Sequence, residues 1–384
     1  MDTASISLEA DRAAATGDVG RAIALLKQAA EQGQDDPALW LKMAAMQRMS
    51  GNPRAALDSV HRALALSPLD FTALLMRASL LQRLGDAGSG EAWGHALAQR
   101  PADPPPQLAS VLAEAEQHHG RWLAEREGRM VAAMREAESQ ASEEERQRIA
   151  RFRSNALRRT RVYHSEPTHS HFPELRECEF HPRSAFPWLD DLEAATDAIA
   201  EELEAVMAAE RAELVPYIQY EDHQPLRQWR ELNRNRDWTA IHLIQNGNTV
   251  DANARHCPRT LDVVARLPQP AIPGSGPNAM FSLLAPHTHI PAHVGVSNAR
   301  LVCHLPLVVP EGCWFRVGAE KREWVPGNAF VFDDTIEHEA MNDSDSLRVV
   351  FIFDVWHPDL TETERDAVAA LIGSEGGAES AEGL

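Results

Sequence analysis

A period of 34 residues runs through the first third of the chain and restricts how that third can fold. Gly17, Gly51 and Gly85 are 34 residues apart, and each is followed by Asp or Asn, as expected in a turn. An alanine precedes each glycine by seven residues, where two crossing helices require a small side chain. Self-similarity at this spacing predicts helix pairs stacked as an array over about residues 5–100.

This pattern resembles tetratricopeptide repeats, in which helix pairs stack into a curved solenoid. Pro68 follows Gly51 by 17 residues and is placed to end the second helix of the middle unit. After Gly85 the third unit departs from the pattern, as a terminal repeat often does. An alanine-rich helical bundle without repeats is the alternative interpretation, but a period kept at several positions favours the repeat.

Two changes of composition divide the rest of the chain. The proline-rich stretch 101–106 breaks the helical pattern, and the polar, Glu- and Arg-rich sequence around it predicts a helical linker over residues 101–165. The adjacent His118 and His119 in this linker are interpreted as part of a solvated helix face rather than as a metal pair. Residues 166–360 are predicted to form a β-rich domain, and residues 361–384 a short helix and a flexible tail.

Short β-like runs alternate with turn signals from Trp238 onward, for example at Pro326-Gly327. Many short strands joined by tight turns predict a sandwich or jelly-roll barrel, the cupin-like double-stranded β-helix. The expected fold is therefore multidomain, with an all-α tetratricopeptide-like solenoid followed by this barrel. The clearest strand candidates are residues 240–245, 279–285, 301–309, 313–317, 328–332 and 347–356.

The net charge and the cysteines limit the cellular compartment and the classes of partner that are expected. The chain has 57 acidic and 37 basic residues and a net charge of -20, which argues against nucleic acid or an anionic membrane as a partner. No apolar run approaches the roughly 18 residues that span a bilayer, and no signal-peptide pattern is visible. The four cysteines are scattered, as expected for reduced thiols. We therefore expect a cytoplasmic protein that contacts neither nucleic acid nor membrane.

Two histidines and an arginine in the β-rich region have the residue types of a non-haem iron site. His293 and His338 are 45 residues apart, and Arg348 follows the second by ten. Iron(II) oxygenases usually hold the metal with two His and one carboxylate, and the carboxylate normally stands two residues after the first His. Gly295 occupies that position here. The two histidines suit iron and the guanidinium of Arg348 suits a dicarboxylic cosubstrate, but the carboxylate expected as the third metal ligand is absent.

The surrounding sequence resembles the aspartyl/asparaginyl β-hydroxylase family of iron(II)- and 2-oxoglutarate-dependent oxygenases. The resemblance runs from about residue 186 to 358 and is densest in three long strings. These are residues 293–307 (HVGVSNARLVCHLPL), 327–338 (GNAFVFDDTIEH) and 348–358 (RVVFIFDVWHP). In this family two histidines hold the iron without a protein carboxylate, so the resemblance makes Gly295 the family's own residue.

The resemblance also implies the roles of particular residues and the cofactors, Fe(2+) and the cosubstrate 2-oxoglutarate. His293 and His338 look like the iron ligands. Arg348 looks like the salt-bridge partner of the remote carboxylate of 2-oxoglutarate, which a guanidinium can grip with two parallel hydrogen bonds. Ser282 and His304 match family positions that contact the same cosubstrate.

Several nearby residues leave alternatives open. Many relatives have an arginine two residues before the histidine at 304, where this chain has Val302; either the pocket has one cation fewer or Arg300 takes its place. Asp333 and Asp334 precede the second histidine and are expected to orient an imidazole or end a strand rather than bind metal. The further histidines at 287 and 289 are interpreted as exposed loop residues.

The leading functional hypothesis is hydroxylation of an Asp- or Asn-like residue in a peptide or protein, with the repeats presenting the substrate or a partner. An alternative keeps the chemistry but acts on a free amino acid or a small biosynthetic intermediate. A third is a non-catalytic repeat scaffold, against which the intact His293, His338 and Arg348 argue. The sequence leaves the oligomeric state and the substrate open.

Overall fold

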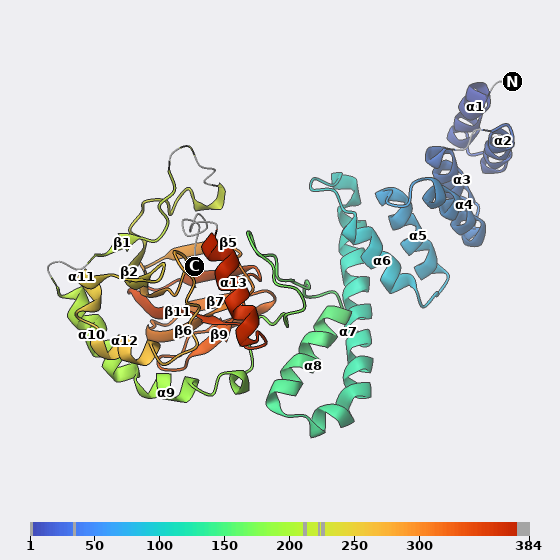
Figure 1. Cartoon of the computed structure of the whole chain (residues 1–384). Helices are drawn as coiled ribbons and strands as arrows, with labels where there is room; N and C mark the ends of the chain where they lie inside the picture. Colours follow the sequence, from blue (N-terminus) through green and yellow to red (C-terminus); the bar gives the residue numbers. More distant parts are fainter. Residues whose placement is uncertain (1–2, 34–35, 210–212, 222, 224–226, 375–384) are drawn as a thin grey trace. The chain divides into compact units, whose positions relative to one another are not determined.

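The computed structural model describes residues 3–33, 36–209, 213–221, 223 and 227–374. The chain divides into two compact units, residues 1–159 and residues 160–384. In Figure 1 the first unit is all helical and the second contains the sheets.

Three helix pairs form the first part of the N-terminal unit, and the 34-residue period sets their turns. Gly17, Gly51 and Gly85 lie at the turn within each pair, with φ of +81°, +80° and +70°, the left-handed region that favours glycine. The alanines seven residues before them are at most 1% exposed, so they lie where the helices cross. The predicted repeat is therefore confirmed. Its helices are α1 (Thr3–Ala15), α2 (Val19–Glu31), α3 (Pro37–Met49), α4 (Pro53–Leu66), α5 (Phe71–Arg83) and α6 (Ser89–Ala98).

The next two helices continue this unit. After a short turn, η1 (Pro106–Leu108), α7 (Ala109–Gln140) packs against α6, and α8 (Glu143–Ala156) returns beside it. A side chain at Gly90 would collide with Trp122, so glycine permits the close approach of α6 and α7. His118 and His119 were expected on a solvated helix face, but both are half-buried against other helices: His119 Nδ1 lies 2.9 Å from the Gly90 carbonyl oxygen of α6, and His118 Nε2 lies 2.8 Å from Gln82 Nε2 of α5. The helices expected in a separate linker up to residue 165 thus belong to the first compact unit, which ends at residue 159.

Two antiparallel sheets form the C-terminal unit, which is the predicted double-stranded β-helix. The larger sheet has the strand order β1-β2-β4-β11-β6-β9, with β3 paired to β2, and the smaller has the order β5-β10-β7-β8. Their bounds are β1 (Val215–Pro216), β2 (Trp238–Gln245), β3 (Asn248–Thr249), β4 (Ala279–Leu284), β5 (Thr288–His293), β6 (Arg300–Val308), β7 (Cys313–Val317), β8 (Glu320–Glu323), β9 (Phe330–Phe332), β10 (His338–Asn342) and β11 (Arg348–Trp356).

The larger sheet has a core on each face. Val349, Phe351 and Phe353 of β11 pack into a cluster with the helices, whereas Val350 and Ile352 pack into the cluster between the two sheets. Alternate residues of a strand point to opposite faces, so a strand buried on both sides is apolar at every position. The helical elements of this unit are η2 (Arg183–Ala185), α9 (Leu189–Ala194), α10 (Thr196–Met207), η3 (Arg227–Trp229), α11 (Asp251–Ala254), α12 (Pro258–Val264) and α13 (Glu362–Ser374).

The six strand candidates from the sequence all correspond to strands, with ends within two residues. The sequence also predicted that His293 starts a long strand, and this was wrong, because His293 ends the short strand β5. The short helix predicted after residue 360 is α13, which extends to Ser374, so the flexible tail predicted from Gly373 does not begin there. The remaining residues of the predicted tail, 375–384, lie outside the described residues.

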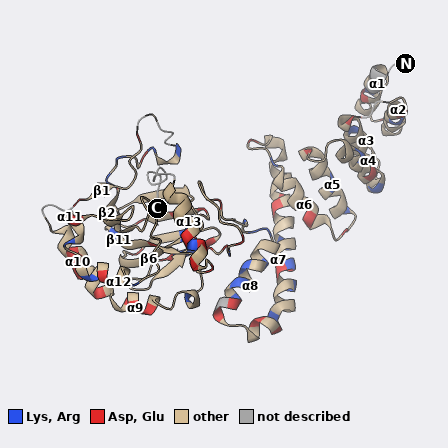
Figure 2. Ribbon diagram, viewed as in Figure 1, with Lys and Arg blue, Asp and Glu red and all other residues tan. Residues whose placement is uncertain are grey.

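Most charged side chains lie on helices and loops, and few lie on the central strands (Figure 2). In the described part of the chain, no helix is long and apolar enough to cross a membrane. Six charged residues of the C-terminal unit are instead buried: Glu202, Arg300, Asp333, Asp334, Arg348 and Asp354. Buried charges require compensation, and two of the six, Asp334 and Arg348, line the cavity described next.

Candidate active site

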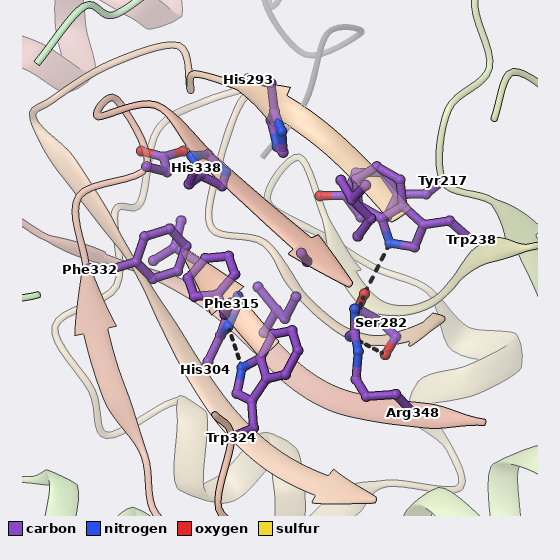
Figure 3. Close-up of a pocket in the computed structure, with 15 residues that line it drawn as sticks. Tyr217, Trp238, Ser282, His293, His304, Phe315, Trp324, Phe332, His338 and Arg348 are labelled. Atoms are coloured by element: carbon purple, nitrogen blue, oxygen red, sulfur yellow. Dashed lines mark hydrogen bonds between the residues drawn. The ribbon is translucent and has the colours of Figure 1, made fainter. Parts of the chain in front are cut away.

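A cavity lies between the two sheets of the C-terminal unit (Figure 3). It contains all five residues that the sequence nominated. In this view His293 and His338 lie at one end and Arg348 lies at the other, with Ser282 and His304 nearby. The described residues that line it are Tyr217, Trp238, Ser282, Ile290, His293, Val302, His304, Phe315, Trp324, Phe332, Asp334, His338, Ala340, Arg348 and Ile352.

Strand pairing brings the two histidines together. His293 ends β5 and His338 begins the antiparallel strand β10, and their Cα atoms are direct partners in the register. The ring centroids are 4.0 Å apart, with an angle of 53° between the ring planes. Burial lowers the pKa of His293 to about 4 and, together with His293 itself, holds the pKa of His338 well below its usual range. Both imidazoles are therefore neutral near pH 7, the form that binds metals.

The hydrogen bonds of the two imidazole rings decide which ring nitrogen has a lone pair available for a metal. His293 Nδ1 lies 2.8 Å from the carbonyl oxygen of Pro291, and His338 Nδ1 lies 3.1 Å from that of Ile336. A carbonyl oxygen only accepts, so the proton of each neutral ring is on Nδ1 and the lone pair is on Nε2. A backbone carbonyl that fixes the ring in this way is typical of metal-binding histidines. Among the described residues, no group of three or more His, Cys, Asp or Glu could hold a metal ion.

Asp334 fills the space beside Gly295. A Cβ added at position 295 would collide with the Asp334 carboxylate, so a side chain there would have to displace it. Both oxygens of this carboxylate are buried without a hydrogen-bond partner in the described structure, and burial raises the pKa of Asp334 to about 7. Asp333 differs, because its carboxylate accepts hydrogen bonds from Thr335 and does not line the cavity. Asp333 thus ends a strand, whereas Asp334 faces the site.

Arg348 is a buried cation without an anionic partner. The side chain is 1% exposed, and its Nη1 donates to the carbonyl and hydroxyl oxygens of Ser282 at 3.3 and 3.4 Å. Its Nε has no hydrogen-bond partner, and no carboxylate of the described residues forms an ion pair with it. Burial lowers the pKa of Arg348 to about 10. The Ser282 hydroxyl also accepts a hydrogen bond from Trp238 Nε1 at 3.1 Å, which fixes its position.

His304 lies in the middle of β6 and contacts the indole of Trp324. Trp324 Nε1 donates to His304 Nδ1 at 3.3 Å, and the Trp324 ring lies 4.7 Å from the guanidinium carbon of Arg348. Burial and the charge of Arg348 hold the pKa of His304 well below its usual range, so this ring is neutral.

Arg300 does not replace the cation absent at Val302. Val302 lines the cavity, whereas Arg300 does not. The Arg300 guanidinium instead lies between two buried carboxylates, 3.9 Å from Asp334 and 3.7 Å from Asp354. Of the described residues that line the cavity, Arg348 is the one with a permanent positive charge.

Sequence reasoning missed the aromatic residues of the site. Trp229 of η3 meets His293 edge-on, with ring centroids 4.9 Å apart, and Tyr217 stacks on Trp238 at 3.8 Å. These side chains come from short or irregular elements without a periodic pattern. The histidines at 287 and 289 are exposed, as predicted, and lie against Asp345 and Glu339, but only His287 is in a loop, because His289 belongs to β5.

Solved structures similar to this chain include the Sgt2 TPR domain of Aspergillus fumigatus, at 19% identity and a TM-score of 0.28, covering 30% of this chain and 77% of that one. Another is the first TPR of Spaghetti (RPAP3) bound to an HSP90 peptide, at 14% identity and a TM-score of 0.27, covering 30% of this chain and 91% of that one.

Relatives of the C-terminal unit include hydroxylases. The human aspartyl/asparaginyl beta-hydroxylase is 36% identical over 141 residues, which are 36% of this chain and 18% of that protein. The human aspartate beta-hydroxylase domain-containing protein 2 is 38% identical over 135 residues, 34% of this chain and 37% of the relative.

The match is longer for the ornithine lipid ester-linked acyl 2-hydroxylase of Rhizobium tropici, which is 32% identical over 190 residues, or 49% of this chain and 63% of that protein. In each of these cases the chain spans less than two thirds of the relative. Residues 193–358 match the model of the aspartyl/asparaginyl beta-hydroxylase family. These residues therefore form a domain of the aspartyl/asparaginyl β-hydroxylase family.

Proposed function

We propose that the C-terminal unit is an iron(II)- and 2-oxoglutarate-dependent hydroxylase. One observation supports this most strongly: a single cavity contains two neutral imidazoles with free Nε2 lone pairs and a buried guanidinium without a counter-ion. The imidazoles fit a divalent transition metal, and the guanidinium fits a carboxylate. A ligand that binds the metal with one end and offers a carboxylate at the other satisfies both, as a dicarboxylic 2-oxo acid does.

The chain's own residues would bind and orient the reactants. His293 and His338 would hold iron through Nε2, and Arg348 would receive the remote carboxylate of 2-oxoglutarate, with Ser282 and His304 as further contacts. Iron and 2-oxoglutarate would supply an oxidation in which one atom of dioxygen enters the substrate and the other enters succinate, with loss of carbon dioxide. The aromatic walls would shield a bound carboxylate from water, which would strengthen its ion pair with Arg348.

We further propose a peptide or protein substrate with an Asp- or Asn-like residue, with the helical repeats as a surface for the substrate or for a partner. Stacked repeats form extended surfaces suited to peptides.

One observation favours a substrate whose oxidised group carries no charge. Arg348 would be occupied by the cosubstrate, Val302 gives the lining an apolar side chain, and Arg300 is paired with aspartates. The described cavity lining then offers no second cation to a substrate carboxylate. An Asn-like residue or an uncharged small molecule fits this lining better than an Asp-like residue.

Succinate release tests the proposal. The full chain with iron(II) and 2-oxoglutarate should form succinate, whereas His338→Ala and Arg348→Met should not. His289→Ala is a matched control for His338→Ala, because it removes the same side chain from β5, the strand paired with β10, at an exposed position outside the cavity lining. Absence of both iron binding and succinate in the wild type would contradict the proposal and favour a repeat scaffold. Mass spectrometry of Asp and Asn peptides, searching for one added oxygen, then separates the substrate classes.

A further inference from the structure

Trp324 contacts two of the three residues expected to hold the cosubstrate, His304 and Arg348, and no role was predicted for it from the sequence. It lies in the loop between β8 and β9, is 4% exposed and lines the cavity. Its indole N–H points to His304 Nδ1 at 3.3 Å, and its ring lies 4.7 Å from the guanidinium carbon of Arg348 (Figure 3). The indole N–H at the ring edge contacts His304, and the face of the ring contacts Arg348.

The hydrogen bond to His304 has a defined direction. An indole N–H only donates, so Nδ1 of His304 must accept and cannot carry a proton. A neutral imidazole carries one proton, and it must therefore be on Nε2. Trp324 thus makes His304 a hydrogen-bond donor through Nε2. This is the opposite tautomer from His293 and His338, whose Nδ1 atoms donate to backbone carbonyls.

The tautomer of His304 and that of His293 and His338 suit different roles in the site. A metal ligand must present a lone pair, whereas a residue that contacts a carboxylate must present a proton. The same indole also places its ring beside Arg348, where a cation–π contact stabilises the charge and limits the guanidinium's orientations. One aromatic side chain would thereby prepare two of the cavity's donors, His304 and Arg348, to bind an anionic oxygen.

We propose that Trp324 is a positioning residue for the cosubstrate, which sets the Nε2–H tautomer of His304 and supports the Arg348 guanidinium so that both can bind a dicarboxylate. This inference rests on the proposed function for the identity of the ligand. The tautomer itself follows from the contacts of Trp324 alone. A purely structural role would require the indole only to fill space, as it does in stacking on Phe315 at 5.4 Å.

The first test measures the tautomer. Nitrogen NMR of histidine-labelled protein, with the signal of His304 assigned from a His304→Gln sample, should show protonated Nε2 in the wild type. Trp324→Phe keeps a ring but removes the N–H, so the spectrum should shift toward a mixture of tautomers. Trp314→Phe is the matched control, because it makes the same change on neighbouring β7, half-buried and outside the cavity lining. Protonated Nδ1 in the wild type, or an unchanged spectrum in Trp324→Phe, would overturn the inference.

The second test measures binding of 2-oxoglutarate by calorimetry to the full chain loaded with zinc, a redox-inert substitute for iron. Loss of one hydrogen bond weakens binding by about 3- to 10-fold, so Trp324→Phe should bind that much more weakly and Trp314→Phe should match the wild type. Because Trp324 acts through His304, the change should be smaller in a His304→Ala background. Equal affinity of wild type and Trp324→Phe would refute the positioning role only. Absence of binding by the wild type would refute the proposed function, and the tautomer would still be decided by NMR.

Discussion

Replacing Arg348 by methionine should stabilise the ligand-free C-terminal unit while removing its response to 2-oxoglutarate. Burial lowers the pKa of Arg348 from 12.5 to about 10. A difference of about 2.5 pKa units, at 1.36 kcal/mol each, corresponds to a cost of ~3 kcal/mol for keeping the charge in the folded state. Because the folded pKa is the lower one, this cost is present at every pH below about 10.

Methionine would also lose some favourable contacts. The guanidinium donates to Ser282 and lies beside the Trp324 ring, and these contacts contribute roughly 1 to 2 kcal/mol together. The net gain for Arg348→Met is therefore ~1 to 2 kcal/mol, in line with the neutral or stabilising effect of replacing buried charges by apolar groups. For a unit of this size each kcal/mol raises the unfolding midpoint by about 2 to 4 °C.

Thermal unfolding of the full chain tests this reasoning. The transition of the C-terminal unit is identified as the one that 2-oxoglutarate and zinc shift upward in the wild type. A ligand at ten times its Kd adds about 1.4 kcal/mol. Arg348→Met should unfold at a higher temperature without ligand and should gain nothing from 2-oxoglutarate. A lower midpoint without ligand would show that the charge is compensated, and an undiminished ligand shift would show that the carboxylate binds elsewhere.

Three further predictions concern the packing of both units. Burial lowers the pKa of His181 to about 3, so below pH 6.5 the unfolded state binds more protons than the folded state. The free energy of unfolding should therefore fall by roughly 2 kcal/mol from pH 6.5 to pH 5. Urea titrations at several pH values should show a shallower fall for His181→Phe. Gly51→Ala should lower the free energy of unfolding by about 1 to 2 kcal/mol, because the φ of Gly51 is +80°. Gly128→Ala inside α7 should raise it by about 0.5 to 1 kcal/mol. Similar urea midpoints for the two variants would contradict this reasoning. Gly295→Asp should lower the thermal midpoint through about 1 to 3 kcal/mol of overpacking against Asp334, and Asp334→Ala in the same chain should restore part of it.

The sequence predicted those parts of the molecule that repeat or alternate. A 34-residue period identifies the helix pairs because the left-handed turn at Gly17, Gly51 and Gly85 and the helix crossings recur in each unit. Apolar strands buried on both faces, such as β11, are visible as continuous runs. The short strand β5 escaped notice, because it is only partly buried and contains a proline at position 291.

Contacts between distant loops could not be predicted in this way. Trp324 lies 20 residues from His304 and 24 from Arg348 along the chain, and three separate elements bring them together. The spacing of these residues along the chain does not predict that their side chains are in contact. The extent of the first unit was likewise hidden, because α7 joins it through a close approach to Gly90 that polar composition does not reveal.

Gly295 shows how packing and chemistry combine at one position. In the sequence it marks the absence of the third ligand of a common iron site. In the structure the space for a side chain there is already occupied by the Asp334 carboxylate, which Arg300 faces at 3.9 Å. A carboxylate is thus present beside the histidines, but it comes from the loop before β10 and is balanced by a buried arginine. Glycine at 295 is required by this packing, so the site could not acquire the usual ligand by a single substitution without displacing Asp334.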